Sequence, residues 1–107
     1  METAGATIND LFNNEGFLCD PQSWNEDLAA SIARQDGLLE LTREHWVIIR
    51  ALREHYLQFG VAPPAFSHLC LANHMDKHCV SHLFRSQREA WRIAGLPDPG
   101  EEARAYM

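Results

Sequence analysis

The segment from Thr42 to Gly60 constrains the fold more than any other part of the chain. Its apolar residues recur every three or four positions and would share one face of a helix: Trp46, Ile49, Leu52, Tyr56 and Phe59. Thr42 suits the cap at the amino end of such a helix, and Gly60 suits the left-handed position just past its carboxyl end. The sequence therefore predicts one long helix between these two residues.

The part of the chain before this helix predicts a hairpin and a shorter helix. Short apolar stretches in residues 7–19 surround the turn-rich segment 13–16, whose Asn and Gly residues tolerate positive φ. They indicate a small β-hairpin, which must pack on helices to be stable. Ser23 and Glu26 have the spacing of a capping box, and the helix that they open should end near Gly37.

Three shorter helices are expected after residue 62. Pro63-Pro64 excludes helix through residue 62 but suits the start of a new one. The three helices run to about Met75, over residues 80–84, and from a second capping box at Ser86 and Glu89 to Gly95. The predicted fold is α+β and mostly helical, with a short N-terminal β-hairpin or meander packed on an array of about five helices. We expect one domain over residues 1–107, with a polar, mobile tail at 100–107.

Charge and composition exclude several classes of function. The formal net charge is -6, and residues 1–62 hold ten acidic and four basic side chains. An acidic surface disfavours unaided binding of nucleic acid and suits docking on other proteins. No apolar run approaches the ~20 residues that a membrane span needs, and residues 1–4 do not open a secretory signal. We therefore expect a cytoplasmic protein. No phosphate-binding loop or catalytic motif stands out, so no cofactor is expected.

The spacing of the cysteines and histidines predicts neither a disulfide framework nor a metal site. Cys19, Cys70 and Cys79 form an odd set without a CxxC pair, so no disulfide framework is expected and a reducing compartment fits. Cys70 lies on an apolar helix face and is interpreted as a core residue. Cys70, His74, His78 and His82 are spaced by four, as ligands on one helix would be, but Asp76-Lys77 should break that helix. No metal site is predicted.

Three motifs in order carry a family resemblance. They are Glu15-Gly16-Phe17-Leu18, then Leu41-Thr42-Arg43-Glu44-His45-Trp46, and finally Arg92-Ile93-Ala94-Gly95-Leu96-Pro97-Asp98-Pro99, which matches [RK]-I-A-G-L-P-K-P at seven of eight places. In this order and at this spacing, the motifs resemble those of the DsrC/TusE family of sulfur-relay proteins over most of the chain. The resemblance implies a setting in sulfur metabolism, with sulfite-reductase-type complexes or a TusBCD-like relay and tRNA 2-thiouridylation machinery as partners.

The same resemblance places the family's reactive thiols on residues that carry no sulfur. In the family, the penultimate cysteine of a flexible C-terminal arm carries a persulfide, and in the DsrC branch a second cysteine in the last helix forms a disulfide with it. Counted from the last motif, the arm cysteine falls on Glu102 and the helix cysteine on Trp91. Because only a thiolate can accept and pass on sulfane sulfur, we expect an adaptor or regulator that acts by protein docking.

Two segments near the last helix also depart from the family. Residues 75–79 are several residues shorter than the basic loop of the family, and residues 85–87 are about two residues shorter than its P-x-G-P stretch. Both lie where family members meet larger partners, so the partners themselves are not carried over by the resemblance alone.

Two alternatives and one candidate surface remain open from the sequence. Cys79 follows Lys77 and His78, and a positive neighbourhood favours a thiolate, so Cys79 is a speculative site for an active sulfur carrier. The helices on either side of Pro63 loosely resemble a helix-turn-helix, which would make the protein a DNA-binding regulator. Arg85, Arg88 and Arg92 would form a stripe on the last helix, which is either a partner-docking face or an ordinary solvated face.

Overall fold

Six α-helices and one turn of 3-10 helix make up the regular structure that is described for this chain. The computed structural model describes residues 11–63, 65–105 and 107. In chain order its elements are the 3-10 helix η3 (Pro21–Ser23), α1 (Glu26–Gln35), α2 (Arg43–Phe59), α3 (Phe66–Ala72), α4 (Cys79–Leu83), α5 (Gln87–Ile93) and α6 (Glu101–Ala105). None of these helices is long and apolar enough to cross a membrane.

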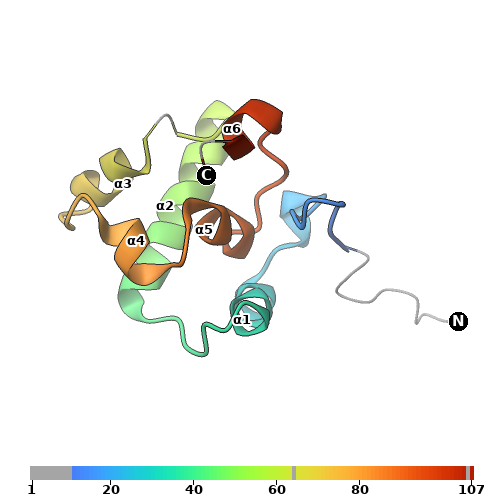
Figure 1. Cartoon of the computed structure of the whole chain (residues 1–107), viewed down its shortest axis with the longest axis horizontal. Coiled ribbons are helices and arrows are strands. Elements are labelled where there is room, and N and C mark those ends of the chain that lie inside the picture. The colour runs from blue at the N-terminus through green and yellow to red at the C-terminus, as the bar shows by residue number, and fades with distance from the viewer. Residues whose placement is uncertain (1–10, 64, 106) are drawn as a thin grey trace, which may run out of the picture.

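Helix α5 lies at the centre of the arrangement. It contacts α1, α2 and α4, while α3 packs on α2 and α4. Figure 1 shows the long helix α2 with α3 and α4 to one side of it and α1 near its amino end, whereas α6 and the C-terminus return to its carboxyl end. The core between these helices contains fully buried side chains from α1, α2 and α5 and from the loops that flank them: Phe17, Leu18, Ile32, Ile48, Ile49, Leu52, Trp91, Ile93 and Leu96.

The predicted ends of α2 are confirmed. Thr42 Oγ1 accepts from the His45 amide at 3.5 Å, and His45 Nδ1 accepts from the Thr42 amide at 3.0 Å. The other ring nitrogen, Nε2, then donates to the Leu83 carbonyl at 2.7 Å, so a single tautomer of His45 satisfies both contacts. Gly60 ends the helix with a φ of 74°. His45 therefore joins the start of α2 to the end of α4.

The predicted β-hairpin is wrong for the residues that the structure describes. Within residues 11–19 there is a single antiparallel bridge, between Phe12 and Leu18, and residues 7–10 of the prediction lie outside the described residues. The Asn13 carboxamide oxygen accepts from the amides of Glu15 and Phe17, at 3.0 and 2.9 Å. Backbone hydrogen bonds from the Asn13 amide to the Phe17 carbonyl and from the Cys19 amide to the Leu11 carbonyl flank the bridge, at 2.8 and 2.9 Å, so the pairing stops after one bridge and forms no strand. Phe17 and Leu18 are both fully buried.

The first capping box is also wrong. Asn25 caps α1, because its Oδ1 accepts from the Leu28 amide at 2.8 Å. Ser23 instead closes η3, whose cap is Asp20. An asparagine one residue before the helix is as good a cap as serine, and here it has the better position.

The three helices predicted after residue 62 are present, but α3 is shorter than expected, and the sequence did not predict α6 in the C-terminal tail. Helix α3 ends at Ala72 instead of about Met75, and His74 follows with a left-handed φ of 62°. Ser86 caps α5 as predicted, with its Oγ accepting from the Glu89 amide at 3.0 Å. Glu89 Oε1 reaches one residue further back than in a capping box and accepts from the Arg85 amide.

The expectation of no disulfide is wrong. Cys70 and Cys79 are bonded to each other, and Cys19 is the free cysteine in the described part of the chain. The bond depends on how the connection between α3 and α4 folds back, which the spacing of the cysteines does not reveal.

Candidate functional site

The segment from Arg92 to Pro99 is held in place by residues from the first half of the chain. Arg53 donates to the Ala94 carbonyl at 2.8 Å and to the Pro21 carbonyl at 3.2 Å, and its guanidinium lies 4.1 Å from the centre of the Trp24 ring. Burial of this guanidinium lowers the pKa of Arg53 below its ordinary value. The Trp24 indole donates to the Ile93 carbonyl at 2.9 Å. The motif therefore marks a packing junction between η3, α2 and the end of α5.

Asp98 connects this segment to both the N-terminal turn and α6. Its carboxylate accepts from the Gly100 amide at 2.9 Å, from Asn13 Nδ2 at 3.0 Å and from Arg104 at 2.5 Å. The Gly100 amide is the largest cause of a lowered pKa for the Asp98 carboxyl, and the Arg104 and Asn13 hydrogen bonds add to it. The pKa of Arg104 is raised, chiefly by its hydrogen bond to Asp98. The described tail is thus attached to the domain by an ion pair that is about three-quarters shielded from solvent.

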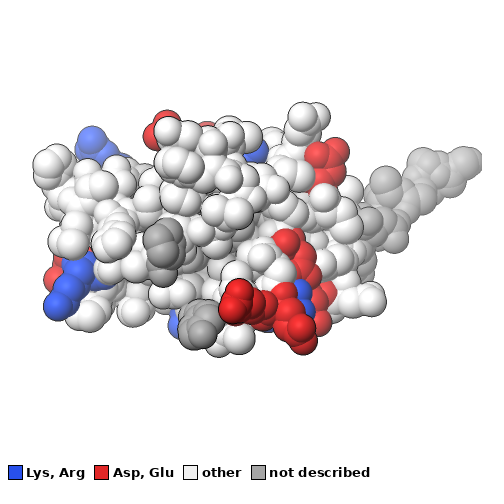
Figure 2. Space-filling view, turned by 90° about the horizontal axis from the view of Figure 1, so that it is seen from above, with Lys and Arg blue, Asp and Glu red and all other residues white. Residues whose placement is uncertain are grey.

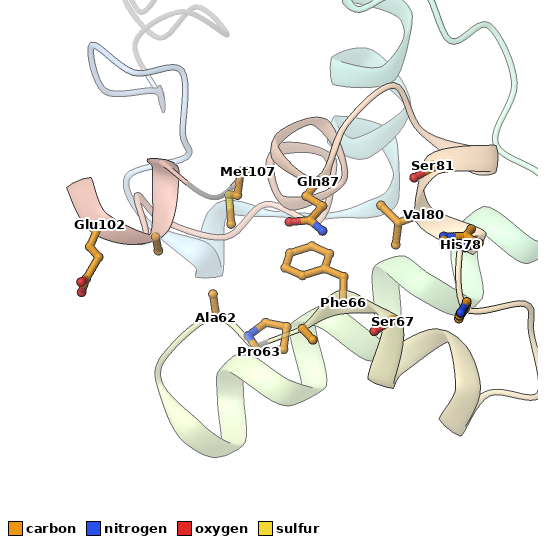
Figure 3. Close-up of a pocket in the computed structure, with 13 residues that line it drawn as sticks. Ala62, Pro63, Phe66, Ser67, His78, Val80, Ser81, Gln87, Glu102 and Met107 are labelled. Carbon is orange, nitrogen blue, oxygen red and sulfur yellow. The ribbon is translucent and has the colours of Figure 1, made fainter.

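A cavity of about 550 Å³ lies beside this tail, between α3, α4, α5 and α6. Figure 3 shows the Phe66 ring projecting into its middle, with Gln87 of α5 facing the ring and Met107 entering from the C-terminus. Polar and basic residues line the end near α4: Ser67, Lys77, His78 and Ser81. Such a cavity can take an apolar side chain of a partner and, at one end, an acidic group.

The predicted arginine stripe divides into two kinds of residue. Arg92 donates to the Gly16 carbonyl at 2.8 Å and pairs with Asp36 at 2.6 Å, and its side chain is 20% exposed. Arg88 donates to the Glu15 carbonyl at 2.6 Å and lies 5.0 Å from the centre of the Phe17 ring. These two arginines attach the N-terminal turn to α5, whereas Arg85 is exposed. The three line a hollow of about 230 Å³ with Asp36, Ser86 and Glu89. Docking by this face stays a prediction.

Comparison with known proteins decides the family. The family described as "DsrC like protein" matches this chain over residues 3–101. The chain is 36% identical to the sulfurtransferase TusE of Salmonella typhimurium over 81% of its own length and 86% of that protein. The chain belongs to the DsrC family.

Solved DsrC structures have the same fold as this chain. The oxidized gamma-subunit of the dissimilatory sulfite reductase (DsrC) from Archaeoglobus fulgidus is 34% identical, with a TM-score of 0.71 over 84% of this chain and 89% of that one. The DsrC of Allochromatium vinosum is 33% identical, with a TM-score of 0.70 over 84% of this chain and 87% of that one. Recognition of the family from its three motifs is therefore confirmed.

The two positions that the resemblance assigns to DsrC-family thiols differ in their surroundings. Trp91 is fully buried, donates to the Pro97 carbonyl at 2.8 Å, and has ring contacts with Tyr56 and Phe66. Glu102 is exposed on α6 at the rim of the cavity, and its carboxylate points away from the cavity in Figure 3. Neither residue can carry sulfane sulfur. Trp91 is a core residue of this family member, and Glu102 is available to a partner.

Cys79 and the nearby histidines do not form an exposed thiol or metal centre in the described structure. Cys79 is 4% exposed and bonded to Cys70, so its sulfur is not a free thiolate here. No group of three or more His, Cys, Asp or Glu side chains within the described ranges is arranged to hold a metal ion. The turn at His74 ends α3, so His74, His78 and His82 do not share one helix face.

Reasoning from the sequence missed the Asp98–Arg104 pair. One signal was available, because Asp98 is the single mismatch in the motif, where the family has lysine. A change from a cation to an anion at that position lets a cation six residues later fold back onto it. The mismatch thus marks the place where this chain attaches its tail.

Proposed function

We propose that this protein is a DsrC-type adaptor or regulator in sulfur relay, which docks on partner proteins without itself carrying sulfane sulfur. The observation that supports this role most directly is the replacement of both family thiol positions, one by the buried Trp91 and the other by the exposed Glu102. A scaffold that keeps the fold of the carriers can still present their docking surface. It cannot take part in the transfer of sulfur at those positions.

Two surfaces of the chain are suited to docking. The cavity beside α6 offers an apolar floor at Phe66 with Lys77 and His78 at one end, and the exposed Arg85 lines the smaller hollow at the start of α5. Figure 2 shows a face, seen from above, that has few charged side chains at its centre, with a cluster of acidic side chains towards one edge and single charged side chains elsewhere on the rim. A partner that places an apolar segment on this face and basic groups at its edge would be complementary in charge. Candidate partners are sulfite-reductase-type complexes and TusBCD-like complexes.

The docking proposal is tested by capture from extracts of the source cell. Full-length protein is immobilised through Cys19, which is exposed and distant in sequence from the C-terminal surface. We expect proteins of sulfur metabolism to be retained. A matched variant, Lys77→Glu, should retain roughly ten-fold less, because the exposed lysine at the end of the cavity becomes a like charge for an acidic partner group. Retention of no sulfur-metabolism protein by the wild-type chain would overturn the proposal.

The absence of sulfur-carrying activity is tested separately by intact mass after incubation with a persulfide donor. The test uses the Cys19→Ser variant, so that no exposed thiol competes. We expect no stable sulfur adduct. In Cys19→Ser with Glu102→Cys, which restores a thiol at the arm position, an adduct should form. A stable adduct on Cys79 in the first variant would instead establish the alternative of an active carrier.

A further inference from the structure

The Cys70–Cys79 bond connects the last turn of α3 to the first residue of α4. The two Cα atoms lie 5.8 Å apart, and the residues are nine apart in sequence. Cys70 is fully buried and Cys79 is 4% exposed, at the edge of the core. Neither residue belongs to the positions at which the DsrC family keeps its thiols.

The connection between the two helices is organised by hydrogen bonds of its own. Asn73 Nδ2 donates to the Leu69 carbonyl at 2.8 Å, and the Met75 amide donates to the Cys70 carbonyl at 2.9 Å. Asp76 then accepts from the His78 amide with its carboxylate and from the Cys79 amide with its carbonyl, both at 2.9 Å. Because these contacts do not involve sulfur, they keep the two cysteines close when the bond is open. A reduced pair can therefore close again.

The same connection gives a reductant a short path to the sulfur atoms. Residues 71–78 are mostly exposed and include no fully buried side chain, in contrast to α2 and α5 on the other side of the bond. Local opening of this segment exposes Cys79 without unfolding the core, since segments with few buried contacts open at a small fraction of the global free energy. Lys77 lies two residues before Cys79, and a cationic neighbour favours the thiolate that leaves when the bond is reduced.

We propose that Cys70 and Cys79 form a reversible dithiol–disulfide couple whose substrates are thiols and disulfides of the glutathione type or of dithiol proteins. In the reducing direction, one thiolate attacks a sulfur of the bond and forms a mixed disulfide, and a second thiol resolves it. Two thiols are thereby oxidised to one disulfide, and Cys70 and Cys79 gain two electrons and two protons. The oxidising direction is the reverse, with a disulfide as the oxidant.

The couple also sets the rigidity of one wall of the cavity beside α6. Helix α3 contributes Phe66 and Ser67 to that wall, and α4 with the residue before it contributes His78, Val80 and Ser81. The Cys70–Cys79 bond is a side-chain cross-link between these two groups of lining residues, in addition to the backbone of residues 71–78 that joins them. Reduction removes this cross-link and leaves the exposed backbone segment and noncovalent contacts, so the α4 side of the wall becomes more mobile.

Reversibility is tested on the full-length Cys19→Ser variant under native conditions. The protein is equilibrated in buffers of different reduced to oxidised glutathione ratio and in dithiothreitol, then alkylated and weighed as an intact chain. We expect the doubly alkylated fraction to rise with the ratio of reduced to oxidised glutathione, and to be the same whether the protein starts oxidised or reduced. The circular dichroism spectrum should not change. A bond that is reduced only after denaturant is added would overturn the proposal, as would thiols that never pair in oxidised glutathione.

The control is Cys19→Ser with Cys70→Ser, in which Cys79 can form only a mixed disulfide. Hydrogen exchange then tests the coupling to the cavity wall. Amides of Cys79–Leu83 should exchange roughly ten-fold faster or more in the reduced protein, whereas those of Arg43–Phe59 should change only as far as the whole domain is destabilised. Equal rates for Cys79–Leu83 in the two states would overturn the coupling. No partner protein enters either measurement, so failure of partner capture leaves these results unaffected.

Discussion

Gly95 shows how one residue without a side chain determines the packing of the family motif. It has a φ of 69°, and a Cβ atom at this position would overlap the Trp24 ring. Gly60 has a similar φ of 74°, but nothing lies within 4 Å of a Cβ added there. A substitution at Gly60 therefore adds only backbone strain to the free energy of the folded state, whereas one at Gly95 adds steric overlap as well.

Substitution of these two glycines should have unequal effects. Gly95→Ala should lower the free energy of unfolding by about 2–4 kcal/mol, because left-handed strain and overpacking against Trp24 add together. Gly60→Ala should cost about 1 kcal/mol, from strain alone. Urea unfolding followed by tryptophan fluorescence measures both. Equal losses in the two variants would contradict the packing assigned to Trp24.

Asp98 gives the attachment of the tail a defined pH dependence. Its pKa is lowered in the folded chain, chiefly by the Gly100 amide and then by Arg104 and Asn13. The unfolded chain therefore binds the proton more tightly, and the stabilisation is fully present above the ordinary value of 3.8. It is lost as the pH falls through the lower folded value.

The Asp98→Asn variant should lack this pH-dependent stabilisation. At neutral pH it should be less stable than the wild type by about 1 kcal/mol, the net value of charge-assisted hydrogen bonds at a partly exposed site. The difference should shrink as the pH falls below 3.8. Unfolding titrations from neutral to acidic pH compare the two proteins. A difference that stays constant across this range would show that the charge of Asp98 is not the cause.

Helices α2 and α4 are joined through His45, which is 7% exposed. His45→Ala should lower the free energy of unfolding by about 2–3 kcal/mol, because it leaves the Leu83 carbonyl without its buried donor and removes part of the α2 cap. Thr42→Ala should cost only about 1 kcal/mol, since it affects the cap alone. Hydrogen exchange distinguishes them: only His45→Ala should raise the exchange rate of amides in α4. Faster exchange in α4 of the Thr42 variant would contradict this assignment.

The elements that could be predicted from the sequence are those whose cause is local. Thr42 and Ser86 were correctly predicted as caps, because a cap depends on a hydroxyl and an amide three residues later. Ser23 failed because Asn25 competes for the same role two residues on. The hairpin failed because the pairing around the Phe12–Leu18 bridge is too short to form strands in the described residues, although the turn and its buried apolar residues lie where the sequence indicated them.

The features of the candidate site that could not be predicted depend on long-range geometry. Asp98 meets Asn13 only after the whole chain has folded, so no window of sequence contains both partners. Cys70 and Cys79 come together because the connection after α3 turns back at His74. Their spacing of nine alone fits many arrangements. The family resemblance, by contrast, was readable because its motifs are packing residues with strict steric needs.

At the scale of the whole molecule, the Cys70–Cys79 bond should contribute to stability through the unfolded state. The bond closes a loop between residues nine apart, and restricting the unfolded chain by such a loop is worth roughly 2–3 kcal/mol. We expect the reduced protein to unfold at a lower temperature than the oxidised one in calorimetry. The variant Cys70→Ser should match the reduced protein within about 1 kcal/mol, and a reduced protein as stable as the oxidised one would contradict the expectation.

The contacts of the N-terminal turn have a consequence for how the protein is made. Asn13 binds Asp98, 85 residues later, and the Gly16 carbonyl accepts from Arg92. A nascent chain leaves the ribosome amino end first, so Phe17 and Leu18 stay unburied until α5 has been synthesised. Folding of this domain therefore finishes only after the chain has been synthesised as far as Asp98.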